Sequence, residues 1–415
     1  MRAKTLIIVM LLLASLMVFL TGCTRFQNKS LNNNQGMEEK AEEKFPSTKP
    51  DPITEQVNNM TLEEKIGQMV IVGFEGYTLD DKIKELIEKH HVGGLILFGR
   101  NIKDPVQLLA LINSLKTANT NNKVPLFISV DEEGGRISRM PNQLKKLPTN
   151  KRIGRVNNEE FAYQIGGILA EEIKSFGFNL NFAPVLDIDS NPKNPVIGDR
   201  AFSSDPGIVS RLGIQVMKGI QAGVVIPVVK HFPGHGDTVV DSHIGLPSLN
   251  HSLERLHNFE LIPFKDAINN QADAVMIAHI LLNKVDKENP ASLSKRIVTD
   301  LLRKELNFDG IVITDDLTMG AITKNYSLED AAVKAVNAGS DIILVCHGYN
   351  NELSVIGALK KAVEEGSISK ERVDESVTRI LKLKSKYNLS DKQIKSVDLE
   401  KINSKINTVL DLYLN

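Results

Sequence analysis

The feature that most constrains the fold of this chain is a series of eight short apolar runs that alternate with amphipathic stretches. Nearly continuous apolar runs are typical of strands that are buried on both faces of a parallel sheet. The predicted strands are 69–74, 93–98, 126–131, 180–188, 224–232, 274–279, 311–316 and 341–346.

Helical patterns fill the intervals between these runs. Ser327, followed by Asp330, has the pattern of a helix N-cap, and Ser369 precedes the last long helix of the series. The expected helices include 61–68, 80–90, 105–117, 158–176, 206–222, 253–269 and 327–338. Eight alternating units predict an α/β fold of the (β/α)8 TIM-barrel class, a single domain at 57–388. An open doubly wound sheet is the alternative, and it usually needs fewer strands.

The two ends of the chain carry a different pattern. A basic start, an apolar run from Leu6 to Leu20 and small residues before Cys23 are typical of a secretory signal, with a single transmembrane anchor as the alternative. The Leu20-Thr21-Gly22-Cys23 ending resembles a bacterial lipobox. We therefore expect a lipoprotein signal peptide at 1–22, lipidation of Cys23, a flexible polar tether at 23–56 and a lipid-anchored, extracytoplasmic location at the cell membrane. The tail at 389–415 is expected to be helical.

Composition narrows the class of protein further. With 42% hydrophobic and 24% charged residues, the chain is neither a disordered nor a multi-span membrane protein. Its 50 Lys and Arg nearly cancel its 51 Asp and Glu, so we expect no nucleic-acid partner. Two cysteines do not support a disulfide framework.

Polar residues stand at the ends of six of the eight predicted strands. In a parallel barrel these ends meet at one face, where active sites are found. One polar ending is usual for a surface loop, but six together indicate an ionisable pocket. The residues concerned are Asp131, Asp187, Asp189, Lys230, His231, His279, Asp315, Asp316, Cys346 and His347.

The segment 230–247 is the richest in chemistry and, with its glycines and prolines, is predicted to be a long loop over the barrel mouth. Its three histidines and two aspartates leave two interpretations open. One is a metal site, since His is the commonest metal ligand. The other is an acid/base device, since the Asp241-Ser242-His243 spacing allows a carboxylate to orient an imidazole.

The run Lys230-His231-Phe232-Pro233-Gly234-His235-Gly236, with Asp241-Ser242-His243 downstream, resembles the signature of family 3 glycoside hydrolases. More narrowly, it is similar to the bacterial β-N-acetylglucosaminidases that recycle cell-wall muropeptides. Segments that agree in order are 93–101, 131–139, 198–202, 276–279 and 313–317, and the resemblance spans about residues 55–388.

The resemblance implies a role for each matching residue. Asp315 is expected to be the nucleophile, His243 the general acid/base and Asp241 its charge partner, in a retaining mechanism without a cofactor or metal. Two cations, Lys230 and Arg200, are expected to keep Asp315 ionised by lowering its pKa. The residues expected to bind the sugar are Asp131, Arg139, Arg200, Lys230 and His231.

Several residues keep a second interpretation. Asp316 is the alternative nucleophile, although alternation along a strand should turn only one of the two aspartates to the pocket. Structural roles are open for His235 and His279 and favoured for Asp187, Asp189 and Cys346. Glu132 and Glu133 are interpreted as loop charges that pair with Arg136 or Lys145.

The functional expectation is an exo-acting β-N-acetylglucosaminidase that works on peptidoglycan fragments as a monomer, with phosphate attack on its intermediate as a possible side reaction. Few residues follow the predicted barrel, which agrees with the short branch of the family. The alternatives are a β-glucosidase or β-xylosidase of the same fold, a metal-dependent barrel hydrolase, and a tethered sugar-binding protein without activity.

Overall fold

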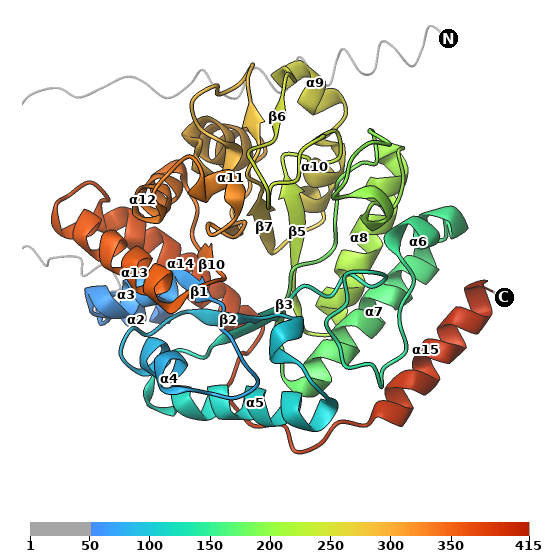
Figure 1. Ribbon diagram of the computed structural model, residues 1–415, viewed down its shortest axis with the longest axis horizontal. Coiled ribbons are helices and arrows are strands. Elements are labelled where there is room, and N and C mark those ends of the chain that lie inside the picture. The colour runs from blue at the N-terminus through green and yellow to red at the C-terminus, as the bar shows by residue number, and fades with distance from the viewer. Residues whose placement is uncertain (1–50, 415) are drawn as a thin grey trace, which may run out of the picture. The chain divides into compact units, whose positions relative to one another are not determined.

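The apolar runs form eight strands that pair in parallel and close into a barrel (Figure 1). The structure is a computed structural model that describes residues 51–414. The strands are β1 Val70–Val72, β2 Gly94–Leu97, β3 Phe127–Val130, β4 Leu180–Asn181, β5 Ile226–Phe232, β7 Ala274–Ile277, β9 Ile311–Thr314 and β10 Ile343–Val345. β1 pairs with β10, and a parallel bridge between Ile313 and Ile342 joins β9 to β10. The ring is closed, and the predicted TIM barrel is confirmed.

Helices surround this barrel, and most start where a capping side chain predicts. Asp80, Asp104 and Ser327, for example, each accept a hydrogen bond from the backbone of the first turn that follows. The helices are α2 Pro52–Asn58, α3 Leu62–Gln68, α4 Asp81–Glu88, α5 Pro105–Ala118, α6 Asn150–Val156, α7 Glu159–Phe176, α8 Pro206–Ala222, α9 Leu253–Asn258, α10 Ile262–Asn269, α11 Gly320–Thr323, α12 Leu328–Ala338, α13 Tyr349–Glu364, α14 Lys370–Lys386 and α15 Leu399–Leu414, with a π-helix at Arg296–Glu305.

Two predicted elements differ from the structure, and proline explains both. The strand expected at 180–188 pairs only over Leu180–Asn181, because Pro184 has no N–H to donate, and the ladder resumes at Val185. The helix expected at 253–269 is two helices, and Pro263 stands in the first turn of the second, where a missing N–H costs nothing.

The chain on either side of the barrel is partly helical. The end of the predicted tether, residues 52–56, instead begins helix α2, and Val57 of this helix is buried. At the other end, α15 lies along α7, where the rings of Phe161 and Tyr413 stack at 4.9 Å (Figure 1). The signal peptide, Cys23 and the rest of the tether lie outside the described residues. Across residues 51–414, the helices are too short or too polar for any of them to pass through a bilayer.

Candidate active site

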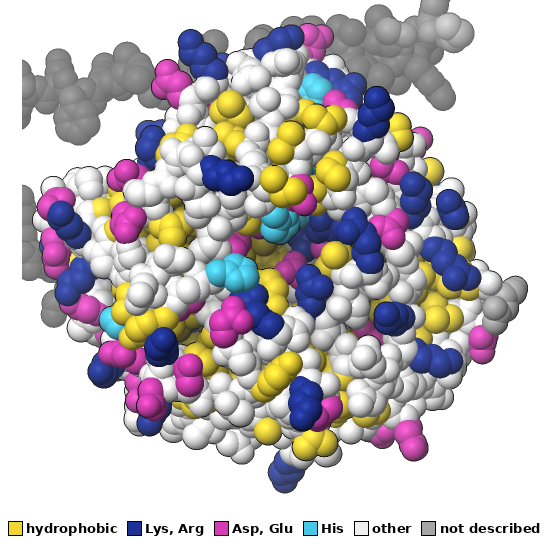
Figure 2. All heavy atoms as spheres, viewed as in Figure 1, with side chains coloured by type: hydrophobic (Ala, Val, Ile, Leu, Met, Phe, Trp, Pro, Cys, Tyr) yellow, Lys and Arg dark blue, Asp and Glu magenta, His cyan; other side chains and the backbone are white. Residues whose placement is uncertain are grey.

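A cavity of about 170 Å³ opens at the face where the barrel strands end. In the space-filling view it is a hollow bordered by basic, acidic and histidine side chains (Figure 2). The ionisable residues that line it are Asp131, Glu133, Arg139, Arg200, Lys230, His231, His235, His243, Asp315, Asp316, Cys346 and His347. The cavity is smaller than pockets for drug-sized ligands, about 300 to 1,000 Å³, and has the scale of a single sugar ring.

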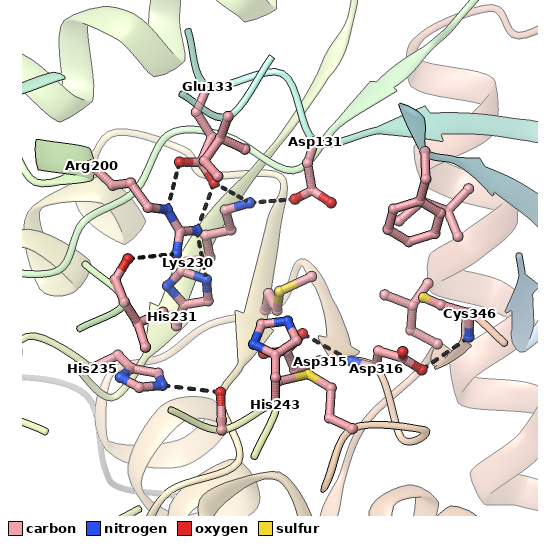
Figure 3. A pocket seen from close by; sticks show the side chains of 18 of the residues that line it. Asp131, Glu133, Arg200, Lys230, His231, His235, His243, Asp315, Asp316 and Cys346 are labelled. Atoms are coloured by element: carbon pink, nitrogen blue, oxygen red, sulfur yellow. Dashed lines mark hydrogen bonds and ion pairs between the residues drawn. The ribbon is translucent and has the colours of Figure 1, made fainter. Parts of the chain in front are cut away.

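One wall of the cavity is a network of ion pairs (Figure 3). The Lys230 ammonium contacts Asp131 Oδ1 at 2.5 Å and Glu133 Oε1 at 2.7 Å. Arg200 donates to both oxygens of Glu133, from Nη2 at 2.7 Å and from Nε at 2.9 Å. Burial alone would raise the pKa of Glu133, but Arg200 and Lys230 outweigh it and hold this pKa well below the usual range. The wall therefore presents fixed donors and acceptors to the cavity.

His231 is oriented from behind by a buried carboxylate. Its Nδ1 lies 2.6 Å from Asp187 Oδ2, and Arg200 Nη2 lies 3.4 Å from its Nε2. Since a guanidinium can only donate, Nε2 accepts and Nδ1 donates to Asp187. Asp187 also accepts the backbone N–H of His235 at 2.6 Å. Asp187 thus has the structural role expected of it, behind the cavity wall, whereas Asp189 pairs with Lys151 at 3.0 Å.

Asp315 follows β9 directly and is half-buried at the cavity. Its Oδ1 accepts the N–H of Asp316 at 2.9 Å. Burial alone would raise the pKa of Asp315, but the imidazoles of His279 and His231 and this N–H outweigh burial and lower the pKa. Lys230 and Arg200, the cations expected to have this effect, are instead paired with Asp131 and Glu133.

The adjacent Asp316 also lines the cavity, contrary to the expectation from strand alternation. The reason is that β9 ends at Thr314, so both aspartates lie beyond the pleated part of the strand. The carboxylate of Asp316 holds the backbone of two other residues through hydrogen bonds. It accepts the N–H groups of Thr318 and Cys346, each at 2.9 Å, and the Thr318 hydroxyl at 2.5 Å. Asp315 is thus the aspartate of the two with a carboxylate available to a ligand.

His243 lies on the loop that follows β5 and lines the same cavity as Asp315 (Figure 3). Its Nδ1 and its backbone N–H contact Asp241 Oδ1 at 2.8 and 2.9 Å. The side chain is 67% exposed, so solvent and a ligand can both reach Nε2. Burial tends to raise the pKa of Asp241, but these two contacts with His243 outweigh it and lower the pKa. Asp241 therefore stays ionised beside the imidazole.

Arg139 reaches the cavity from the loop after β3. Glu132 holds its backbone, since Oε2 accepts the N–H of Arg139 at 2.7 Å and that of Met140 at 3.3 Å. The Nε of Arg139 is buried and lacks a hydrogen-bond partner within residues 51–414. A donor is therefore free at the cavity.

Glu132 and Glu133, which follow Asp131, are not the loop charges that the sequence predicts. Both are buried, and neither pairs with Arg136 or Lys145. Arg136 pairs with Asp199 at 2.7 Å, and Lys145 bonds to Asn407 of α15. Two acidic residues in succession after a strand end were the available signal. The partners of Glu133 are Lys230 of β5 and Arg200 of a distant loop, which the sequence does not place, whereas Glu132 holds the backbone of its own loop.

The two remaining histidines have internal partners. His279 is buried between the Ser292 hydroxyl at 2.7 Å and the carbonyl of Asp316 at 3.0 Å, and burial lowers its pKa. His235 is held by Thr238 at 2.7 Å and Ser242 at 3.3 Å, and burial lowers its pKa to about 4. Burial therefore disfavours the charged form of both imidazoles, and both side chains support the walls of the site. Within the described chain, His, Cys, Asp and Glu side chains do not gather in threes at a spacing that could hold a metal ion.

Comparisons with known proteins identify the family of this chain. Residues 61–383 match the family described as the glycosyl hydrolase family 3 N-terminal domain. A β-hexosaminidase A from Pseudoalteromonas piscicida is 34% identical over 367 residues, which cover 79% of this chain and 61% of that protein. A family 3 β-N-acetylglucosaminidase structure from Paenibacillus sp. FPU-7 has a TM-score of 0.80 at 42% identity, covering 85% of this chain and 69% of that one. A β-N-acetylhexosaminidase from Beutenbergia cavernae has a TM-score of 0.73 at 28% identity, covering 79% and 99%. The chain belongs to glycoside hydrolase family 3.

Proposed function

We propose that this chain is a retaining, exo-acting β-N-acetylglucosaminidase that removes terminal N-acetylglucosamine from peptidoglycan fragments. One observation carries the proposal. An available carboxylate, Asp315, and an imidazole oriented by a carboxylate, His243 with Asp241, face the same cavity, which is the size of one sugar ring. The matched relatives named above are β-hexosaminidases, which supports an acetamido sugar as the substrate.

In the first step, Asp315 attacks the anomeric carbon and forms a glycosyl ester, while the bond from this carbon to the leaving oxygen breaks. His243 gives its Nε2 proton to that oxygen, and Asp241 holds Nδ1. The lowered pKa of Asp315 keeps the nucleophile ionised, as attack on the anomeric carbon requires.

In the second step, water replaces the leaving group. The neutral Nε2 of His243 takes a proton from this water as its oxygen bonds to the anomeric carbon, and the ester bond to Asp315 breaks. A histidine suits both directions because its ordinary pKa lies near neutrality.

The ion-pair wall supports an exo mode of cleavage. Asp131, Glu133, Lys230 and Arg200 close the side of the cavity away from Asp315 and offer charged groups to sugar hydroxyls (Figure 3). A sugar with its anomeric carbon at Asp315 then has its non-reducing end against this wall. A preceding sugar unit would displace the ion pairs, so only a terminal residue is accepted.

The first test compares 4-nitrophenyl N-acetyl-β-glucosaminide with the matching β-glucoside. Cleavage of the first and not the second, lost in Asp315→Asn and with a flattened pH profile in His243→Ala, is the expected result. Preference for the glucoside would keep the mechanism and refute the substrate. Activity that survives in Asp315→Asn, or that is lost with a chelator, would refute the mechanism.

We further propose that Cys23 carries a lipid that anchors the protein outside the cytoplasm. The sequence before Cys23 supports this proposal. The full chain should partition with membranes and into detergent, and Cys23→Ser should be found in the soluble fraction. Equal partitioning of both proteins would refute lipidation.

A further inference from the structure

The segment that follows Asp315 along the chain also contacts the loop that carries His243. The N–H of Ala321 donates to the carbonyl of Ser242 at 2.9 Å. The ammonium of Lys324 donates to the carbonyl of Ile244 at 2.6 Å. The backbone is therefore held immediately before and immediately after His243.

Gly320 allows this approach. A methyl group added at Gly320 would lie 2.5 Å from the carbonyl oxygen of His243 and 3.1 Å from that of Ile244. Both contacts are with backbone, which cannot turn away as a flexible side chain can. The loop lies closer to this position than any residue other than glycine permits.

The loop has little packing of its own to hold it in place. The side chains of Val239 and Ile244 are 64% and 66% exposed, and His243 itself is exposed. Burial of apolar area, which fixes most backbone positions, is nearly absent at this tip. The remaining contacts are the turn centred on Asp241, the Ser242–His235 bond at 3.3 Å and the contacts to 320–324.

We propose that residues 320–324, here called the docking segment, position His243 for proton transfer. The docking segment begins five positions after the nucleophile, so one short piece of chain sets the place of both Asp315 and His243. Gly320 and Lys324 are positioning residues, because they act on His243 through its backbone and do not themselves reach the reacting atoms. This inference rests on the proposed function.

A displaced imidazole has a specific kinetic effect. Proton donation matters for a poor leaving group such as phenolate and is not needed for 2,4-dinitrophenolate, which leaves as a stable anion. A change in the docking segment should therefore lower kcat/KM for a substrate with a phenolate leaving group and leave kcat/KM unchanged for one with a 2,4-dinitrophenolate leaving group. A general loss of structure would lower both.

The test uses the full chain and measures kcat/KM for the phenyl and the 2,4-dinitrophenyl N-acetyl-β-glucosaminides. Gly320→Ala should lose about tenfold or more on the phenyl substrate and stay within about twofold of wild type on the other. Lys324→Met, a milder change at an exposed site, should shift the same ratio by about threefold. Gly357→Ala is the matched control, because a methyl group there meets no atom within 4 Å.

A second arm places Gly320→Ala in a His243→Ala background, where it should cause no further loss because the group it positions is gone. Equal losses on both substrates, no loss, or additive losses in the double variant would each overturn the inference while leaving the proposed function intact. Should Gly320→Ala fail to fold, Lys324→Met alone decides the ratio, since its side chain is at the surface. A wild-type protein that cleaves neither substrate would refute the proposed function, and the inference with it.

Discussion

At the scale of single residues, this site differentiates chemically identical side chains through their hydrogen-bond partners. Asp315 and Asp316 are adjacent, yet Asp316 accepts three hydrogen bonds from Thr318 and Cys346, whereas Asp315 accepts one, from the N–H of Asp316. A carboxylate whose lone pairs already accept hydrogen bonds is a poor nucleophile, but it holds the neighbouring backbone in place. The division of roles follows from where β10 and residue 318 place their donors.

Asp316→Asn should therefore lower the stability of the protein more than its catalytic activity. We expect the melting temperature to fall by several degrees, since an amide replaces one acceptor with a donor. The variant should still form a covalent glycosyl-enzyme, detectable by mass spectrometry with a slow fluorinated substrate. Asp315→Asn should form none and lose on the order of 10³-fold or more in kcat. Labelling of Asp316 in the wild type would contradict this assignment.

Glu133→Gln tests the buried wall at the same scale. Removing one anion leaves Lys230 and Arg200 under-compensated, and we expect a loss of about 3 kcal/mol in the free energy of unfolding at pH 7. Because the pKa of Glu133 is lowered on folding, its stabilisation is present above its unfolded pKa and is lost as pH falls through the folded pKa. Urea unfolding at pH 7 and pH 5 should give the same difference. The surface substitution Glu254→Gln is the control, and an equal effect there would refute the prediction.

At the scale of elements, the loop from β3 to α6 is attached to the barrel through a buried acid. Glu132 holds the backbone of Arg139 and Met140, and both it and Glu172 of α7 border one small cavity beneath this loop. Burial raises the pKa of Glu132 to about 7, and burial together with the charge of Glu132 raises that of Glu172. The two carboxyl groups cannot both ionise without cost, so the attachment of the loop depends on pH.

The sign of this dependence follows from the direction of the shift. The folded protein keeps a proton on Glu132 that the unfolded chain releases near pH 4.5, so stability should fall as pH rises from about 4.5 to 7. Glu132→Gln keeps an acceptor for the two N–H groups and has no proton to lose. Its melting temperature should therefore decline less over this range than that of wild type. Parallel curves for the two proteins would contradict the prediction.

At the scale of the whole molecule, opposite ends of the barrel have different tasks. The end with the cavity holds ionisable groups that a ligand can reach. The other end is closed by buried charged groups that already have hydrogen-bond or ion-pair partners within the protein. The ammonium of Lys384 donates to Gln68 Oε1 at 2.8 Å and to the carbonyls of Gly93 at 2.9 Å and Pro125 at 2.7 Å. Asp341 at the same end is surrounded by Arg303, Arg372 and Arg379.

Lys384→Met should lower the stability of the protein without changing its activity. Three buried acceptors lose their donor at once, and we expect a loss of about 3 kcal/mol in the free energy of unfolding with KM unchanged. Lys382→Met, at an exposed position of the same helix, should change neither. Chemical denaturation and steady-state kinetics on the three proteins check this. A raised KM in Lys384→Met would show that the two ends are coupled.

Much of this architecture was predictable from local patterns. All eight strands and most of the long helices were expected, because hydrophobic periodicity, capping residues and prolines act over a few residues. Helices α6 and α13 and the π-helix at Arg296–Glu305 were not among the expected elements. The misplaced ends, at 180–188 and 253–269, came from prolines within otherwise regular patterns. Strand ends also indicated where the polar residues of the site would gather, including Asp131, Lys230 and Asp315.

The amino-acid sequence by itself determined the barrel and the set of ionisable residues at its mouth, because hydrophobic period and strand order are local properties of the chain. Only the tertiary structure decided which residues share a proton or a charge. Glu133 meets Arg200 and Lys230, Asp316 binds the backbone after β10, and residues 320–324 hold the loop of His243. These pairs join segments dozens of residues apart, and hydrogen bonds act over about 3 Å, so closing the barrel is what creates them.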